Sequence, residues 1–141
     1  MPLWTIYHSP GIFTDEDKGH LAARITDHYE QIGIPRFYVI TIFNQTQPED
    51  LYVGGEPSPA AVRVVIDHIA RRSADKQSRQ RTAKWINGIL GPYLQRHEGL
   101  HWEFHVDETS EDIWMINGLV PPPGGSDAEK AWAAANTTLP Y

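Results

Sequence analysis

Pro2 stands directly behind the initiator methionine, and its position gives it a possible chemical role. Methionine is normally trimmed before a residue as small as proline, which would leave a secondary amine at the start of the chain. An α-amino group titrates at roughly 7.7–8.0, and burial or a nearby cation lowers that pKa further. Such an amine accepts protons at physiological pH, as a general base beside a carbonyl group must. Pro2 is therefore the candidate catalytic residue, and the alternative is a Met-Pro start without chemical function.

Two adjacent arginines, Arg71 and Arg72, follow the apolar run 62–70 and precede a helical pattern. In β-α-β architecture, residues at the carboxyl end of a strand face the ligand crevice. Guanidinium groups near a helix N-terminus suit a carboxylate, because they offer paired donors. These residues predict a site for a small carboxylate substrate. The alternative is a solvated pair of charges in a turn.

The segment 97–101 contains the pattern His-Glu-x-x-His of zinc hydrolases. That pattern binds zinc when one unbroken helix presents both imidazoles on the same face. Here Gly99 interrupts the motif and residues 102–106 alternate like a strand, so the two rings cannot be aimed at one ion. We predict no metal site, and proton transfer by an amine needs no organic cofactor. The other histidines are expected at the surface or in the core: His8, His20, His28 and His68.

The composition is that of an ordinary globular protein, with 141 residues of which 40% are hydrophobic and 21% charged. The net charge of −6 and the lack of a long basic run argue against nucleic acid as a partner. The chain has no cysteine, which excludes disulfides and thiolate chemistry. It shows neither a signal-peptide pattern nor an apolar stretch of membrane-spanning length, so we expect a cytoplasmic protein that does not bind membranes.

The first part of the chain shows a β-α-β pattern. Residues 3–8 alternate and predict a strand that begins almost at the first residue. Thr14, followed by three acids, predicts the start of a helix whose apolar residues recur to Ile32, and the sequence at 33–35 ends it. Residues 37–43 predict the next strand.

The same pattern recurs after a loop over residues 44–59. Residues 62–69 predict a strand, Ser73 a helix cap, and residues 101–106 a further strand. The chain is thus a degenerate duplication of one unit.

The two units span about residues 2–44 and 61–107. Each unit alone has an amphipathic helix and two half-covered strands, so pairing both units in one sheet is the natural way to bury them. We predict a single α+β domain over residues 1–141, with a four-stranded mixed sheet and two helices on one face.

A C-terminal extension, residues 108–141, follows the second unit. Ser126 and Glu129 form the pattern of a capping box for a last helix over about 127–136. The extension is rich in alanine and tryptophan, and we expect it to dock on the same subunit or on another.

Several short segments, in order and at matching spacing, resemble the tautomerase superfamily. The longer proteins related to cis-3-chloroacrylic acid dehalogenase, including the fungal oxalocrotonate tautomerase group, are the most similar in layout. The segments that carry the resemblance are residues 2–8, 23–27, 54–55, 72–75 and 118–124. The resemblance implies the tautomerase fold, a homotrimer, and Pro2 at the floor of a pocket in which arginine holds the substrate carboxylate.

The resemblance also assigns candidate binding residues. By position, Arg72 matches one of the dehalogenase's two carboxylate-binding arginines; Ile69 stands at the other, so Arg71 would substitute from a shifted place. The family's substrate-binding histidine falls at Tyr29, and Asn117 is a further candidate polar contact.

The dehalogenase's water-activating pair falls at Phe104 and about Ile116, where neither side chain can activate water. This departure disfavours hydrolytic dehalogenation. Together with Trp114, these side chains predict a drier pocket that lowers the pKa of the Pro2 amine and favours an aromatic or hydrophobic 2-oxo acid.

The sequence thus predicts a keto–enol tautomerase-like isomerase that uses Pro2 for proton transfer on a small 2-oxo or unsaturated carboxylic acid. Two alternatives stay open. One is a hydratase, dehalogenase or decarboxylase of 3-carbon acids on the same scaffold. The other is a non-catalytic trimeric binding protein.

Overall fold

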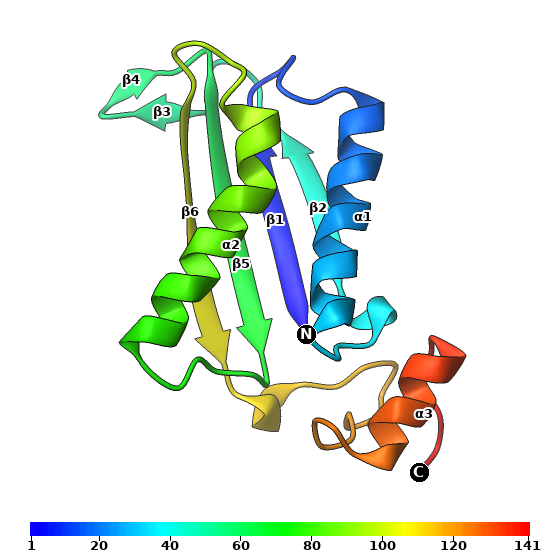
Figure 1. Cartoon of the computed structure of the whole chain (residues 1–141). Coiled ribbons are helices and arrows are strands. Elements are labelled where there is room, and N and C mark those ends of the chain that lie inside the picture. Colours follow the sequence, from blue (N-terminus) through cyan, green and yellow to red (C-terminus); the bar gives the residue numbers. More distant parts are fainter.

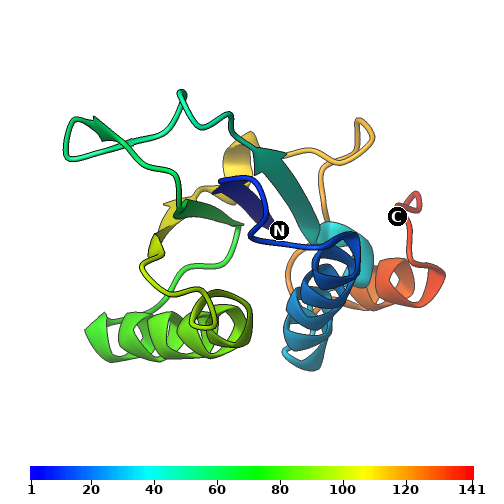
Figure 2. The ribbon, with the colours of Figure 1, turned by 90° about the horizontal axis from the view of Figure 1, so that it is seen from above.

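The computed structural model describes residues 1–141 and contains one four-stranded sheet with two long helices on one of its faces (Figures 1 and 2). In spatial order the strands are β2 (Ile40–Gln45), β1 (Pro2–His8), β5 (Ala61–Ile69) and β6 (His101–Thr109). The two helices are α1 (Asp15–Gln31) and α2 (Lys76–Leu94). The predicted α+β class, mixed sheet and placement of both helices on one face are confirmed.

The direction of β1 decides which ends of the strands meet. β1 runs parallel to β2 but antiparallel to β5, whereas β5 runs parallel to β6. Pro2 therefore lies opposite His68, and the first residues of the chain meet the last residues of β5 at one end of the sheet.

The core lies between the sheet and the two helices. Along β1, every second side chain is buried against the helices, including Trp4 and Ile6, which are fully buried. Leu21 and Ile25 of α1 and Leu90 of α2 meet them from the other side and are equally inaccessible. This period of two in the strand and of about 3.6 in the helices is what the sequence pattern predicted.

The first helix begins and ends as its sequence indicates. The Thr14 side chain accepts a hydrogen bond from the Asp17 amide, and the Asp17 carboxylate accepts one from the Thr14 amide, which completes a capping box. At the other end the helix gives way at Ile32 to Gly33, whose φ of +85° is a conformation that favours glycine.

The strand predicted over residues 37–43 is wrong in its first part. Arg36–Tyr38 form a 3-10 turn after Pro35, and β2 begins only at Ile40. Tyr38 is buried against Trp114 and Trp132 of the C-terminal extension. This contact between distant parts of the chain overrides the local preference of the aromatic run for a strand.

The predicted cap of the second helix is also wrong. Asp75, not Ser73, caps α2: its carboxylate accepts a hydrogen bond from the Ser78 amide at 2.7 Å, and the Ser78 hydroxyl accepts one from the Asp75 amide. The Ser73 amide instead donates to the carboxylate of Glu108 on β6. The loop over 44–59 contains a short hairpin, β3 (Tyr52–Val53) and β4 (Glu56–Pro57).

The C-terminal extension docks on the same subunit, at the end of the sheet where the chain begins (Figure 1). Its helix α3 (Asp127–Ala135) buries Trp132 completely within the main core. The predicted capping box of this helix forms only in half. The Ser126 hydroxyl accepts from the Glu129 amide, but the Glu129 carboxylate turns away from Ser126. No helix in the structure combines the length and the apolar character needed to cross a membrane.

Candidate active site

Pro2 and both arginines come together at the end of the sheet where β1 begins and β5 ends. Pro2 is buried, and it lines a small cavity of about 160 Å³. Tyr29 from the last turn of α1, Arg71 and Arg72 line the same cavity. The structure thus brings together four of the five predicted site residues.

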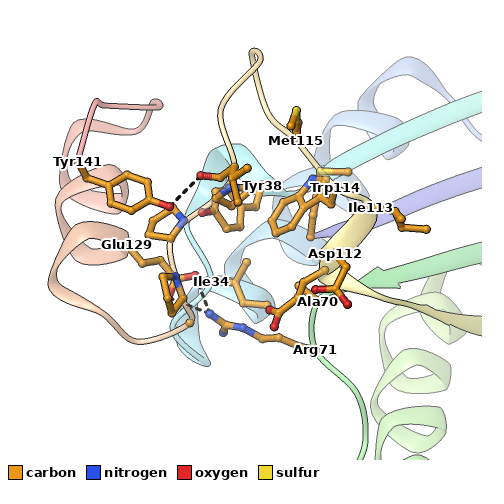
Figure 3. Close-up of a pocket in the computed structure, with 17 residues that line it drawn as sticks. Ile34, Tyr38, Ala70, Arg71, Asp112, Ile113, Trp114, Met115, Glu129 and Tyr141 are labelled. Carbon is orange, nitrogen blue, oxygen red and sulfur yellow. Dashed lines mark hydrogen bonds and ion pairs between the residues drawn. The ribbon is translucent and has the colours of Figure 1, made fainter.

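A larger cavity of about 680 Å³ shares lining residues with the small one, and Figure 3 draws the residues that line it. Met1, Ile34 and Arg71 line both cavities, so these three residues form the wall between them. A volume of this size lies within the roughly 300–1,000 Å³ of small-molecule sites.

The lining of the larger cavity comes mostly from the C-terminal extension. Trp114 and Tyr141 bring aromatic surface, Tyr38 faces them from the turn before β2, and residues 120–123 bring aliphatic and proline surface (Figure 3). Trp114 therefore lines the larger cavity, but not the small cavity that Pro2 lines, where it was expected. Phe104 and Ile116 do not line either cavity and pack against the core instead.

The N-terminal amine lies in this wall. The Met1 amine donates a hydrogen bond to the carbonyl of Ile69 at 2.6 Å, and the Ile69 amide donates to the Met1 carbonyl at 2.9 Å. Burial and, to a smaller degree, the charge of Arg71 lower the pKa of this amine to about 5, against an opposing effect of Glu129. The Met1 amine is therefore uncharged at neutral pH.

The two arginines differ in their surroundings. The Arg71 guanidinium is paired with the carboxylate of Glu129 through Nη2, at 2.8 and 2.9 Å from the two oxygens. Arg72 is exposed and makes no hydrogen bond or ion pair within the chain. Arg72 is thus free to bind an anion, whereas Arg71 is held in place.

Two residues that line the small cavity, Tyr29 and His68, belong to a chain of hydrogen bonds. The indole of Trp4 donates to the Tyr29 hydroxyl at 3.1 Å, and that hydroxyl lies 2.6 Å from Nε2 of His68. Burial and the nearby N-terminal amine lower the pKa of His68 to about 4, and burial raises the pKa of Tyr29. His68 is therefore neutral at physiological pH, and its Nε2 shares a hydrogen bond with the Tyr29 hydroxyl.

The acid sensitivity of the fold should reflect this buried histidine. A folded-state pKa of about 4, below the ordinary 6.5, means that protonation favours the unfolded chain. The free energy of unfolding should fall as the pH drops from about 6.5 to about 4, with His68 contributing up to about 3 kcal/mol of that loss. His68→Gln should flatten this pH dependence in urea titrations, whereas the exposed His20→Gln should leave it unchanged. Parallel curves for wild type and His68→Gln would contradict the assignment.

Asn117, the fifth predicted site residue, lies elsewhere. It occupies the exposed turn between Ile116 and Leu119 with a φ of +52°, and its amide donates to the Thr138 hydroxyl at 3.3 Å. It lines neither cavity. The histidines of the His-Glu-x-x-His pattern are also separated in role: the His97 ring bonds to the Ile12 carbonyl, and the exposed His101 begins β6.

The sequence alone does not identify two residues of the site, His68 and Glu129. His68 carries no distinguishing local pattern, although its place opposite Pro2 follows once β1 and β5 are paired. Glu129 was assigned to a helix cap by its spacing from Ser126, and nothing in the sequence indicates that it reaches Arg71 across 58 residues of chain.

Comparisons with known proteins identify the family and the fold of the chain. A family profile described as "Putative oxalocrotonate tautomerase enzyme" matches residues 1–137. The crystal structure of native RhCC from Rhodococcus jostii RHA1 is 39% identical, with a TM-score of 0.91 and 99% of each chain covered. The structure of "a probable enzyme" from Aspergillus fumigatus is 40% identical, with a TM-score of 0.93, and covers 100% of this chain and 98% of its own.

More distant structures share the fold. N1, a member of the cis-3-chloroacrylic acid dehalogenase family, is 24% identical with a TM-score of 0.74, covering 98% of this chain and 92% of its own. A fused 4-OT described as a symmetric trimer is 23% identical with a TM-score of 0.66, covering 84% and 94%. No curated protein matches the chain.

Proposed function

Because the chain belongs to the oxalocrotonate tautomerase family whose profile matches residues 1–137, we propose that it is an enzyme that moves a proton on a small 2-oxo or unsaturated carboxylic acid, with the Pro2 amine as the base. The observation that carries this proposal is the burial of Pro2 in a cavity that two arginines also line. The proposal requires that Met1 be removed, since the amide nitrogen of a Met1–Pro2 bond is not basic.

Removal of Met1 would change the site in two ways. It would free the secondary amine of Pro2, and it would take away one of the three residues that separate the two cavities. The amine would then lie beside both cavities, with Arg71 and Arg72 in the lining of the small one. The burial and the cation that lower the pKa of the Met1 amine to about 5 lie beside Pro2 as well, so they favour an uncharged base.

The proposed reaction is keto–enol tautomerisation. The Pro2 amine takes a proton from the carbon next to the substrate carbonyl, the released electron pair forms the C=C bond, and the carbonyl oxygen takes up the charge. The protonated amine then returns a proton on the oxygen side. Arg71 and Arg72 hold the carboxylate and spread the developing enolate charge, and the aromatic lining of the larger cavity suits an aromatic substrate body.

Arg72 provides the direct test of carboxylate binding. We expect wild-type enzyme to enolise phenylpyruvate, in a panel that also contains pyruvate and the 3-haloacrylates. Arg72→Ala should raise KM for phenylpyruvate about 10- to 100-fold with a smaller change in kcat, because a charge-assisted contact to the substrate is lost.

Arg81→Ala is the matched control, since Arg81 is an exposed arginine of α2 outside both cavities. A wild-type enzyme that is inactive on every 2-oxo acid of the panel would contradict the tautomerase proposal. Equal KM values in the two variants would remove Arg72 from substrate binding.

One observation favours a second candidate, the addition of water to a 3-carbon unsaturated acid. Glu111 and Asp112 place carboxylates on the wall of the larger cavity, whereas the positions of the dehalogenase's water-activating pair hold no such group. In that reaction Pro2 would act as an acid. The pH–rate profile separates the two: activity that is lost below the pKa of the amine indicates a base, and activity that is lost above it indicates an acid.

We further propose a homotrimer. The face of the sheet that the helices leave open carries Ile40 and Ile42, which are 42% and 46% exposed, beside Tyr7 at 36%. Half-exposed apolar side chains on neighbouring strands are the kind of surface that a partner subunit buries. Sedimentation equilibrium should give three times the 16.0 kDa chain mass. A trimer without activity on the panel and with Met1 retained would favour the binding-protein alternative.

A further inference from the structure

We infer that Glu129 is a positioning residue that holds the Arg71 guanidinium at the boundary of the two cavities, so that the C-terminal helix forms part of the substrate carboxylate site. This inference rests on the proposed function for its kinetic readout. Glu129 is only 5% exposed, and both of its carboxylate oxygens accept from Nη2 of Arg71 (Figure 3). The amide of Gly125 donates to the same carboxylate at 2.6 Å.

The Glu129 carboxylate does not make the local helix-cap contact that its position favours, and it binds Arg71 instead. At the third position of α3, the ordinary partner of a glutamate is the amide of the cap residue Ser126. That amide instead donates to the Pro123 carbonyl at 3.1 Å. A buried carboxylate is costly unless it is paired and fully hydrogen-bonded, and Arg71 and Gly125 supply that pairing.

Ala70 and Gly124 also influence the direction of the Arg71 side chain. Ala70, directly before it, has a φ of +73°, a left-handed conformation that is uncommon for a residue with a side chain and that sets the direction in which Arg71 leaves β5. On the other side, a Cβ on Gly124 would lie 3.2 Å from Nη2 of Arg71. The absence of a side chain at Gly124 therefore gives the guanidinium its room.

This arrangement divides the donors of Arg71 between two tasks. Nη2 is occupied by Glu129, whereas Nη1 and Nε have no partner within the chain. A substrate carboxylate can accept a hydrogen bond from Nη1 while Glu129 keeps the guanidinium from turning into solvent. The charge of Glu129 also offsets that of Arg71 at the nearby amine, whose pKa Arg71 lowers and Glu129 raises.

Glu129→Gln in the full-length chain tests the inference. We expect KM for phenylpyruvate to rise about tenfold with little change in kcat, because the amide holds Arg71 less firmly than a carboxylate does. The acid limb of the profile of kcat/KM against pH should move to lower pH, since removing the negative charge lowers the pKa of the amine. Asp127→Asn, an exposed first-turn acid of the same helix, is the matched control and should change neither.

A binding experiment separates this inference from the proposed reaction. Calorimetry with 3-phenylpropionate, which has a carboxylate but no carbonyl group to enolise, should show about tenfold weaker binding to Glu129→Gln. The double variant of Glu129→Gln and Arg71→Ala should bind no more weakly than Arg71→Ala alone, because Glu129 acts through Arg71.

The outcomes are distinct. Weaker 3-phenylpropionate binding without turnover in any variant would keep the positioning role and remove the tautomerase proposal. Additive losses in the double variant would overturn the inference. So would a Glu129→Gln variant whose melting temperature falls while KM, the acid limb and binding stay unchanged, or a wild-type protein that does not bind 3-phenylpropionate.

Discussion

Pro2→Ala should lower kcat/KM for phenylpyruvate enolisation about 10²- to 10⁴-fold, the range that a positioned general base contributes. The substitution leaves a primary amine on a backbone without the proline ring, which no longer holds the nitrogen in one direction. Steady-state kinetics with wild type and variant side by side measure the effect.

The fold should survive this change. Pro2 has no amide proton to contribute to the sheet, so alanine removes no backbone hydrogen bond from β1. Circular dichroism and thermal unfolding should therefore match those of the wild type. Intact-mass measurement on both proteins should show that Met1 is absent, because retained methionine would block the amine in either one. Equal activity of the two trimmed proteins would exclude the proline nitrogen from the mechanism.

Trp132→Ala should have the largest effect on stability, about 3–5 kcal/mol in the free energy of unfolding. The Trp132 side chain is completely buried, packs against Phe37, Tyr38 and Tyr141, and donates from its indole to the Leu139 carbonyl at 2.7 Å. Its removal leaves a cavity between α3 and the rest of the core. Urea titration measures the loss.

Limited proteolysis adds a spatial readout to this prediction. If Trp132 anchors the C-terminal extension, the variant should be cut within residues 108–141 before the rest of the chain. Asp127→Asn changes an exposed residue of the same helix, keeps the tryptic site at Lys130 and should leave the digestion pattern as in wild type. A Trp132→Ala chain that is as stable and as resistant as wild type would show that the extension does not depend on this contact.

The regular elements could be predicted from local signals alone. The alternation along residues 3–8 and the capping pattern at Thr14 state how the chain behaves over a few residues, and short-range interactions are enough to realise them. The pattern failed where distant contacts compete. The aromatic run at 36–38 is a turn because Tyr38 packs on the C-terminal extension, and the expected cap contact of Glu129 is given up for Arg71.

The sequence by itself determined the candidate chemistry: a proline at the start of a strand, two arginines after another strand, and two β-α-β units that need one shared sheet. Only the tertiary structure decided that β1 and β5 run antiparallel, which brings the first residue of one unit to the arginines of the other. It also decided that the C-terminal extension closes the larger cavity, that His68 borders the small one, and that Glu129 holds Arg71. The physical reason is the range of the interactions involved. The spacing of residues in a sequence indicates the hydrogen bonds and the periodic burial within one helix or strand. Cavities and buried charge pairs arise only when separate elements exclude water between them.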